Sequence, residues 1–226
     1  MQALARIPLR TGAAHRVLSS SILRQSVASP LRHSQASFSA AAKVSKVLSA
    51  EIKGEEEQYE KPKEVTQFLK SSAYQLVEKE GDVNIMLTKE VDGKEVRIEF
   101  QLMSPTYMEE EEGGDSNDAT EFTVIVEEKA AKKGMTFYCS TLSGEDHRFT
   151  IGQVATHASA EEAESDTRYQ GPDFEDLDEQ LQESLDEYLA ELGVSNDLCD
   201  FIDQMALDKE QREYIRWLKS VKSFIE

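Results

Sequence analysis

FEDLDEQLQESLDEYLAELGVSNDLCDFIDQMALDKEQREYIRWLKSVKSFIE, residues 174–226, carries the densest apolar pattern of the chain outside its predicted strands. The apolar residues recur at steps of three and four, which is the spacing of one helix face. This pattern predicts two helices, over residues 174–192 and 195–225. Asp173 is placed to cap the first helix, and Gly193 is placed to end it.

The second of these helices carries a long apolar stripe. Asp208 with Gln211 has the form of a second capping signal, which predicts a kink or restart of the helix near Asp208. Beyond that point the apolar residues exceed what a solvated helix end needs, so we expect them in the core or in a subunit contact. These residues are Tyr214, Ile215, Trp217, Leu218, Val221 and Ile225.

The middle of the chain supplies the surface that these helices need, because its apolar period changes to two. The clearest example is residues 95–102, where apolar and polar residues alternate strictly, as in a strand with one buried face. Asp92-Gly93 is a tight hairpin signal, and Gly152 marks a bulge. Strands are predicted at 74–79, 83–88, 95–102, 122–127, 135–141, 147–154 and 168–170.

The order of the predicted elements indicates the fold class. About six or seven antiparallel strands are joined by hairpins, and the helices are segregated to the two ends of the chain. They therefore cannot cross over between parallel strands, which predicts a single α+β domain. Long helices with apolar stripes favour self-association, with helix-on-sheet packing within one chain as the alternative.

The N-terminal 42 residues have the composition of a mitochondrial presequence. They are rich in Arg, Ser and Ala, contain no acid, and lack the continuous apolar core of a secretory signal. We expect cleavage between Arg32 and Lys43, and a domain over residues 43–226. That domain begins with a helix over 43–60, which Pro62 stops, and residues 65–69 follow as a short helical turn or loop.

Charge is distributed unevenly along the chain. The formal net charge is −19, but seven of the 25 basic residues and no acidic residue lie in residues 1–50. Residues 51–226 therefore hold 18 basic and all 44 acidic residues, a net charge of −26. Such a body repels nucleic acid and anionic membranes and attracts basic proteins.

Acidic residues gather in two segments that follow predicted strands. The first lies between Ser104 and Glu128 and the second between Ala158 and Glu187, and only Arg168 interrupts the second. We expect these carboxylates to form a surface that binds basic partners. The candidate residues are Glu109, Glu110, Glu111, Glu112, Asp115, Asp118, Glu161, Glu162, Glu164 and Asp166.

Known catalytic and metal-binding patterns are missing from the sequence. There is no nucleophile elbow, dinucleotide-binding fingerprint or P-loop. A calcium-loop reading of residues 115–120 fails because Thr120 stands where glycine is required. Cys139 and Cys199 make no disulfide framework, and no apolar run is long enough to span a membrane. We predict a protein that is not an enzyme and that has no cofactor and no metal site.

Three segments resemble a known family. DQMALDKEQREYIRWLKSVKSFI, residues 203–225, closely resembles the C-terminal helix of the mitochondrial acidic matrix proteins, also called the mitochondrial glycoprotein family. VSKVLSAEIKGEEEQYE, residues 44–60, resembles the N-terminal helix of that family. LDEYLAELGVSNDLCDFI, residues 185–202, resembles its junction between helices. The resemblance covers essentially all of residues 43–226.

The resemblance implies a fold and a role. It implies a seven-stranded, strongly twisted antiparallel sheet with one N-terminal and two C-terminal helices, assembled as a ring-shaped homotrimer. It also implies a location in the mitochondrial matrix and a role in mitochondrial translation, ribosome assembly and oxidative phosphorylation, without known catalysis.

Two function hypotheses follow. The first is a non-catalytic acidic adaptor or chaperone that binds basic mitochondrial proteins, such as ribosomal proteins or translation factors, with no sequence-specific nucleic-acid binding. The second, from another class, is a protein that buffers divalent cations or polyamines through its acidic segments.

Overall fold

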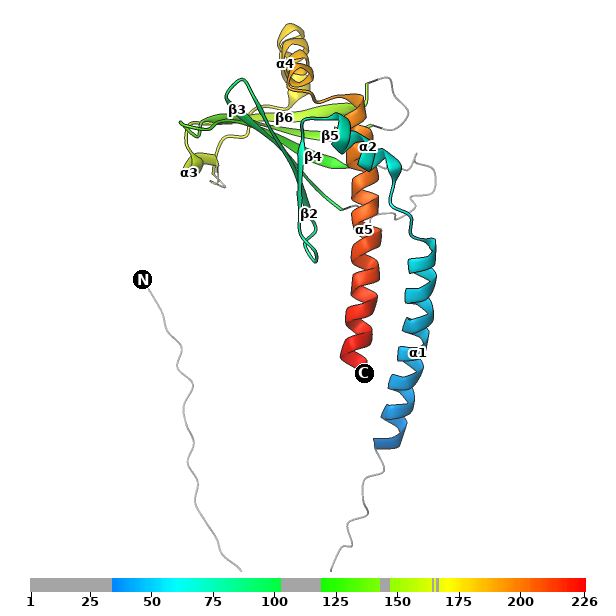
Figure 1. The fold of residues 1–226 in the computed structure, drawn as a ribbon. Helices are drawn as coiled ribbons and strands as arrows, with labels where there is room; N and C mark the ends of the chain where they lie inside the picture. The colour runs from blue at the N-terminus through cyan, green and yellow to red at the C-terminus, as the bar shows by residue number, and fades with distance from the viewer. Residues whose placement is uncertain (1–33, 103–118, 143–146, 164, 166) are drawn as a thin grey trace, which may run out of the picture.

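The computed structural model describes residues 34–102, 119–142, 147–163, 165 and 167–226 (Figure 1). Its elements follow one another as two helices, six strands and then four helical segments. They are α1 (Ser34–Gln58), α2 (Lys63–Ser71), β1 (Gln75–Glu78), β2 (Asn84–Val91), β3 (Lys94–Gln101), β4 (Glu121–Glu128), β5 (Gly134–Thr141), β6 (Phe149–His157), α3 (Ala160–Ala163), the 3₁₀ turn η2 (Phe174–Asp176), α4 (Glu179–Glu191) and α5 (Asn196–Ile225).

The sheet is antiparallel throughout, and its spatial order β1-β2-β3-β4-β5-β6 is the order of the sequence. This meander, with helices before and after it, confirms the predicted α+β class. Six strands lie within the predicted range, but the predicted strand at 168–170 is wrong. Those residues lie outside the ladder, and only an isolated bridge between Gln153 and Asp173 joins the following segment to β6.

One face of the sheet carries the core. Alternate residues of the strands are buried there, and α2, α4 and the first half of α5 supply the rest of the cluster. Phe68 of α2 stacks on Phe201 of α5 with ring centroids 4.6 Å apart, and Phe201 meets Phe100 of β3 edge-on at 6.5 Å. The apolar stripe of the C-terminal segment is therefore buried against the sheet, as its spacing predicts.

The other face of the sheet, which we call the polar face, is turned away from α4 and α5. Tyr138 on this face contacts the segment after α3, whereas its neighbour Phe137 packs toward Tyr188 of α4 at 6.5 Å. Figure 1 shows α3 and α4 on opposite sides of the sheet. Consecutive residues of a strand point to opposite faces, so the two sides of the sheet have separate surroundings.

Two local predictions in the sheet are confirmed. Asp92 and Gly93 join β2 to β3 with φ angles of 49° and 77°, the positive values that a two-residue hairpin turn requires. Gly152 is the extra residue of a bulge, because Tyr138 pairs with Gln153 while Cys139 pairs with Ile151. The bulge reverses the alternation of β6 beyond Gly152.

The first C-terminal helix starts later than predicted. Residues 174–176 form only η2, and α4 begins at Glu179 because the Asp178 side chain accepts a hydrogen bond from the Gln180 amide at 3.1 Å. Asp173 makes no side-chain capping bond. Gly193, with φ of 83°, ends the helix as predicted, and its conformation favours glycine.

The second C-terminal helix is continuous over Asn196–Ile225, so the predicted kink near Asp208 is wrong. Ser195 caps the helix by accepting from the Leu198 amide. The Asp208 carboxylate binds side chains instead of the backbone, namely the Tyr59 hydroxyl at 2.9 Å and Arg212 Nε at 2.8 Å.

Helix α1 runs beside the C-terminal half of α5, away from the sheet (Figure 1). It spans Ser34–Gln58, so it starts before the helix predicted over 43–60 and ends two residues earlier. Polar contacts join the two helices along their length: Gln211 Nε2 donates to Glu55 at 2.6 Å, and Lys219 pairs with Glu56 at 2.6 Å. The predicted short turn at 65–69 is the helix α2.

Candidate functional site

The structure places only part of the predicted acidic surface. Glu161 and Glu162 are exposed in α3, directly after β6. Glu162 also holds its own helix, since its carboxylate accepts from the Ala158 amide at 2.7 Å. The remaining candidates lie outside the described residues: Glu109, Glu110, Glu111, Glu112, Asp115, Asp118, Glu164 and Asp166.

A further acidic surface lies on α4 and η2. Between Arg168 and Lys209 the sequence has thirteen Asp or Glu residues and no Lys or Arg. Glu179, Glu183 and Glu187 recur at steps of four, so they share one face of α4, and all three are exposed. None of the three pairs with a lysine or arginine in the described part of the chain. This face therefore presents uncompensated negative charge to solvent.

The predicted apolar helix residues separate into two groups. Ile215 and Leu218 are buried within the chain, at 8% and 3% exposure, whereas Trp217 is 56% exposed. Tyr214 stacks on Trp217 and donates to Glu51 of α1, and Val221 and Ile225 are half-buried.

A stripe of apolar residues on α5 that are exposed (Leu207, Trp217, Phe224) or half-buried (Tyr214, Val221) emerges from this separation, and we call it the exposed stripe. Its members follow a heptad spacing, which keeps them on one side of the helix. They are Leu207, Tyr214, Trp217, Val221 and Phe224. Within the stripe, Leu207 is 48% exposed and Phe224 is 91% exposed. Two apolar residues of the neighbouring α1 are exposed too, Val44 at 44% and Val47 at 66%. The sequence pattern alone did not separate the stripe facing the core from the stripe facing solvent.

A buried charge cluster joins α5 to β1. The Lys209 side chain is fully buried, and its Nζ donates to the Lys79 carbonyl at 2.6 Å and to Glu213 at 3.1 Å. Arg212 pairs with Glu78 at 2.8 Å. The ammonium thus has two hydrogen-bond acceptors, and the Glu78 carboxylate lies 3.5 Å from it as an ion pair, so this cluster is structural. The pairs Asp208–Arg212 and Lys209–Glu213, spaced by four, were the sequence signal for it.

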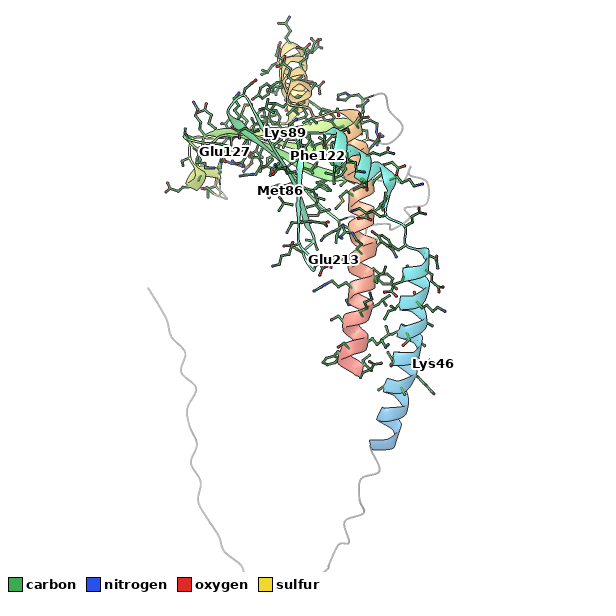
Figure 2. The ribbon with its side chains drawn as sticks, viewed as in Figure 1. Lys46, Met86, Lys89, Phe122, Glu127 and Glu213 are labelled. Carbon is green, nitrogen blue, oxygen red and sulfur yellow. The ribbon has the colours of Figure 1, made fainter. Side chains whose placement is uncertain are left out.

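A second buried cluster, on the polar face, lies far from α5. Figure 2 labels Glu213 on α5 and Glu127 at the end of the sheet that lies away from α5. The carboxylate of Glu127 is 6% exposed and contacts Lys132 Nζ at 3.2 Å, His157 Nε2 at 3.4 Å and Arg97 Nη1 at 3.7 Å. Burial alone raises the pKa of Glu127, but the hydrogen bond from Lys132 and the charges of Arg97 and Lys132 outweigh it and lower this pKa below its usual value.

The two cysteines are buried free thiols, and neither is suited to nucleophilic chemistry. Burial raises the pKa of Cys199 to about 12 and raises that of Cys139 further. A thiol must lose its proton to react, so both are held in the unreactive form.

The described residues offer no metal centre and no membrane span. Across the described ranges, no group of three or more His, Cys, Asp or Glu side chains is placed to hold a metal ion. No helix among the residues with defined structure is both long and apolar enough to cross a bilayer.

Comparison with known proteins identifies the family. The family model described as Mitochondrial glycoprotein matches residues 48–225. The chain belongs to the mitochondrial glycoprotein family. The resemblance found in the C-terminal helix, the N-terminal helix and the helix junction is thereby confirmed. Neither the family description nor the names of the relatives below denote a catalytic activity.

Curated relatives share this assignment. An uncharacterized mitochondrial protein of Arabidopsis thaliana is 28% identical over 163 residues, covering 69% of this chain and 63% of the relative. The mitochondrial acidic protein mam33 of Schizosaccharomyces pombe is 43% identical over 58 residues, covering 26% of this chain and 22% of the relative. The mitochondrial complement component 1 Q subcomponent-binding protein of Mus musculus is 28% identical over 160 residues, covering 62% and 57%.

These matches bear on the cellular location of the chain and on how much of each relative it covers. All three relatives are named as mitochondrial, which confirms the mitochondrial location predicted from the N-terminal segment and agrees with the matrix. The chain spans less than two thirds of the length of each of these relatives.

Solved structures share the fold. A Leishmania major protein, described as hypothetical and as a sequence homologue of the human p32 protein, aligns with a TM-score of 0.67 and 21% identity over 83% of this chain and 99% of its own. The Trypanosoma brucei p22 protein aligns with the same TM-score and 23% identity, over 83% of this chain and 100% of its own. The meander with terminal helices is thus a shared architecture.

Proposed function

We propose that this protein is a non-catalytic acidic adaptor or chaperone of the mitochondrial matrix that binds basic proteins. Its clients would be ribosomal proteins or translation factors, so that the protein supports ribosome assembly, translation and oxidative phosphorylation. The observation that carries the proposal is the run of unpaired carboxylates on α4. Exposed charge of one sign raises the encounter rate of oppositely charged partners and gives binding that salt weakens.

The proposal includes a homotrimer. The apolar stripe on α5 supports it, because side chains as large as Trp217 and Phe224 are exposed on a helix that otherwise packs well. Contiguous exposed apolar side chains mark surfaces that contact other chains. The residues of the stripe would then be covered by another copy of the protein.

A charge-neutralising variant tests the adaptor role. Replacing Glu161, Glu179, Glu183 and Glu187 with Gln removes four exposed carboxylates without changing side-chain size. We expect affinity for a lysine-rich ribosomal protein to fall about tenfold at low salt, from a few tenths of a kcal/mol per exposed ion pair. The fold should persist, as circular dichroism can check.

A matched control separates local charge from net charge. Glu57, Glu90 and Glu128 are exposed carboxylates that already pair with Lys53, Lys129 and Lys133. Their replacement by Gln removes three negative charges, against four in the test variant, but leaves the α4 carboxylates intact. Equal loss of affinity in both variants would mean that total charge, and not the α4 surface, binds the client.

The cation-buffering alternative has its own test. Calorimetric titration with Ca²⁺ or Mg²⁺ would favour it if saturable binding tighter than about millimolar appeared, the weak end of protein calcium sites. The adaptor proposal expects weaker, unsaturated binding.

A further inference from the structure

The free end of the α1–α5 pair carries charge of the opposite sign to the rest of the structure. We call this end, residues 34–50 of α1 with residues 216–226 of α5, the tip. Its charged residues are five basic ones and one acidic one, a net charge of +4: Lys43, Lys46, Arg216, Lys219, Lys222 and Glu226. Residues 51–226 carry −26, of which residues 216–226 contribute +2, so residues 51–215 carry −28.

The tip lies away from the acidic body of the molecule. Helix α1 and the C-terminal half of α5 run side by side beyond the sheet, and α4 lies at the opposite end (Figure 1). Ser45 Oγ donates to Glu226 Oε1 at 2.8 Å, which joins the two helices at the tip. Residues 216–225 extend over about 15 Å of helix, farther than the Debye length of ~8 Å at physiological salt. The end of the tip is therefore screened from the acidic body.

Two lysines of the tip have no partner within the chain. Lys43 and Lys46 are exposed, and neither forms an ion pair with any residue that the structure describes. The other basic groups of the tip each contact one carboxylate: Lys219 with Glu56 at 2.6 Å, Lys222 with Glu226 at 3.7 Å, and Arg216 with Glu213 at 3.7 Å. Lys43 and Lys46 are therefore available to an external anion.

Exposed apolar side chains lie beside these two lysines. Val44 is 44% exposed and Val47 is 66% exposed, and both lie within one helical turn of Lys43 and Lys46. The sequence of α1 before Lys43, residues 34–42, contains no charged residue. Lysines beside exposed apolar residues are typical of helices that rest on a membrane surface.

The valines belong to a surface that the proposed trimer leaves out. Trp217 and Phe224, the aromatic residues of α5 in the tip, are members of the exposed stripe, which another copy would cover. Val44 and Val47 are on α1 and outside that stripe. A partner of the tip would therefore meet lysines and valines, and not aromatic rings.

An anionic bilayer fits this surface better than a nucleic acid does. A bilayer is flat, so it can approach the tip while the acidic body, which it repels, stays beyond the Debye length. A nucleic acid strand binds along a basic groove on stacked aromatic rings, and the valines would gain nothing from its phosphates. No helix within the ranges that the structure describes could span a bilayer, so the contact would be peripheral.

We propose that the tip docks on an anionic phospholipid surface, with Lys43 and Lys46 at the headgroup phosphates and Val44 and Val47 in the interface. Basic residues near such a surface each add to the attraction, and clusters of them on a helix are a known form of lipid recognition. Helix α4 then faces away from the membrane. The proposal stands apart from the adaptor role, because it uses the opposite end of the molecule.

Co-sedimentation with phospholipid vesicles tests the proposal. The chain from Ser34 to Glu226 contains every element of the structure and lacks the five arginines of residues 1–33, which would themselves attract anionic lipid. At low salt we expect it to sediment with vesicles made of equal parts phosphatidylcholine and phosphatidylglycerol. It should stay in solution with phosphatidylcholine alone, and high salt should release it.

Two variants test the two parts of the contact. Replacing Lys43 and Lys46 with Gln should lower the partition coefficient roughly thirtyfold, since each basic residue near an anionic surface contributes a factor of about five. Val47→Asn keeps the charge and should lower it roughly fourfold, the effect of about one buried methylene group. Circular dichroism should show no change in either variant, because these side chains are exposed.

A matched control lies at the other end of α1. Lys61 and Lys63 are exposed, have the same charge and likewise form no ion pair with any described residue. Their replacement by Gln should leave the partition coefficient unchanged. Equal losses in the two lysine pairs, or a wild-type chain that does not sediment with the anionic vesicles, would overturn the proposal.

Two further measurements separate the possible partners. Binding of polyuridylate that depends on Lys43 and Lys46, without binding to vesicles, would overturn the assignment to lipid. Binding of poly-lysine reports on the proposed adaptor role alone. The variant at Lys43 and Lys46 should keep it, and the variant with Gln at positions 161, 179, 183 and 187 should lose it while still binding the anionic vesicles.

Discussion

Glu127 and His157 meet at 3.4 Å although their strands, β4 and β6, are not neighbours in the sheet. The residue between them on β5 is Gly134, which pairs with both. A Cβ atom on Gly134 would lie 2.9 Å from His157 Cε1 and would also collide with the Val126 carbonyl. The absence of a side chain on β5 therefore creates the space in which the carboxylate and the imidazole meet.

Replacing this glycine tests that relationship. Gly134→Ala should destabilise the protein by about 1–3 kcal/mol, the usual cost of overpacking, as measured by urea unfolding. Gly152→Ala is the matched control, because its Cβ would meet only the Tyr138 carbonyl at 3.6 Å, an ordinary contact. Equal effects of the two substitutions would show that the space above Gly134 is not filled by His157.

The lowered pKa of Glu127 predicts acid sensitivity. The folded carboxyl binds a proton less readily than the unfolded one, so stability is full above the usual pKa of Glu, 4.5, and is lost as the pH falls through the lower folded value. Glu127→Gln should lower stability at neutral pH and flatten the fall of stability below about pH 5. Denaturant unfolding across pH measures both effects.

The neighbouring residue provides the comparison. Glu128→Gln removes a half-exposed carboxylate that pairs with Lys133, so the acid-range slope should stay close to that of the wild type. A steeper or unchanged slope in Glu127→Gln would contradict the assignment of acid sensitivity to this carboxylate.

Much of the fold could be predicted because local and global signals agree. The alternation in β3, the Asp92-Gly93 turn, the bulge at Gly152 and the end of α4 at Gly193 each follow from backbone chemistry that one short stretch specifies. Two of the wrong predictions involve Asp residues. Asp208 and Asp173 both look like helix caps, yet one binds Tyr59 and Arg212 and the other lies beside β6.

The candidate site was less predictable because it depends on tertiary contacts. Exposure of Trp217 and burial of Leu218, one residue later, follow from where α1 lies, which no local pattern states. His157 reaches Glu127 through pairing across three strands, and Lys209 reaches the Lys79 carbonyl over 130 positions. Such contacts are set by register and packing.

The buried ammonium of Lys209 should be important for stability. Lys209→Met keeps the apolar stem but leaves the Lys79 carbonyl and Glu213 without their donor, so we expect a loss of roughly 3 kcal/mol. Lys219→Met is the control on the same helix, since Lys219 is 54% exposed and pairs with Glu56 at the surface. Its effect should stay within about 0.5 kcal/mol. Similar losses in both variants would argue against a special role for the buried cluster.

The exposed stripe on α5 should govern assembly and the buried stripe should govern folding. Trp217→Asp should give a folded monomer in sedimentation experiments, because it places charge in the proposed subunit contact. Leu218→Asp should unfold the chain, because it buries an unpaired charge. Ser220→Asp, at an exposed position outside the stripe, should remain a folded trimer. A trimeric Trp217→Asp variant would remove the stripe from the interface.

The central claim is that the carboxylates of α3 and α4 bind basic clients, and affinity capture from mitochondrial matrix extract tests it most directly. The immobilised wild-type chain and the variant with Gln at positions 161, 179, 183 and 187 are compared at low and high salt, with captured proteins identified by mass spectrometry. The account predicts that the wild type captures basic ribosomal proteins or translation factors at low salt, and that high salt or the variant releases them. Capture of the same proteins by both chains at both salt concentrations would contradict it.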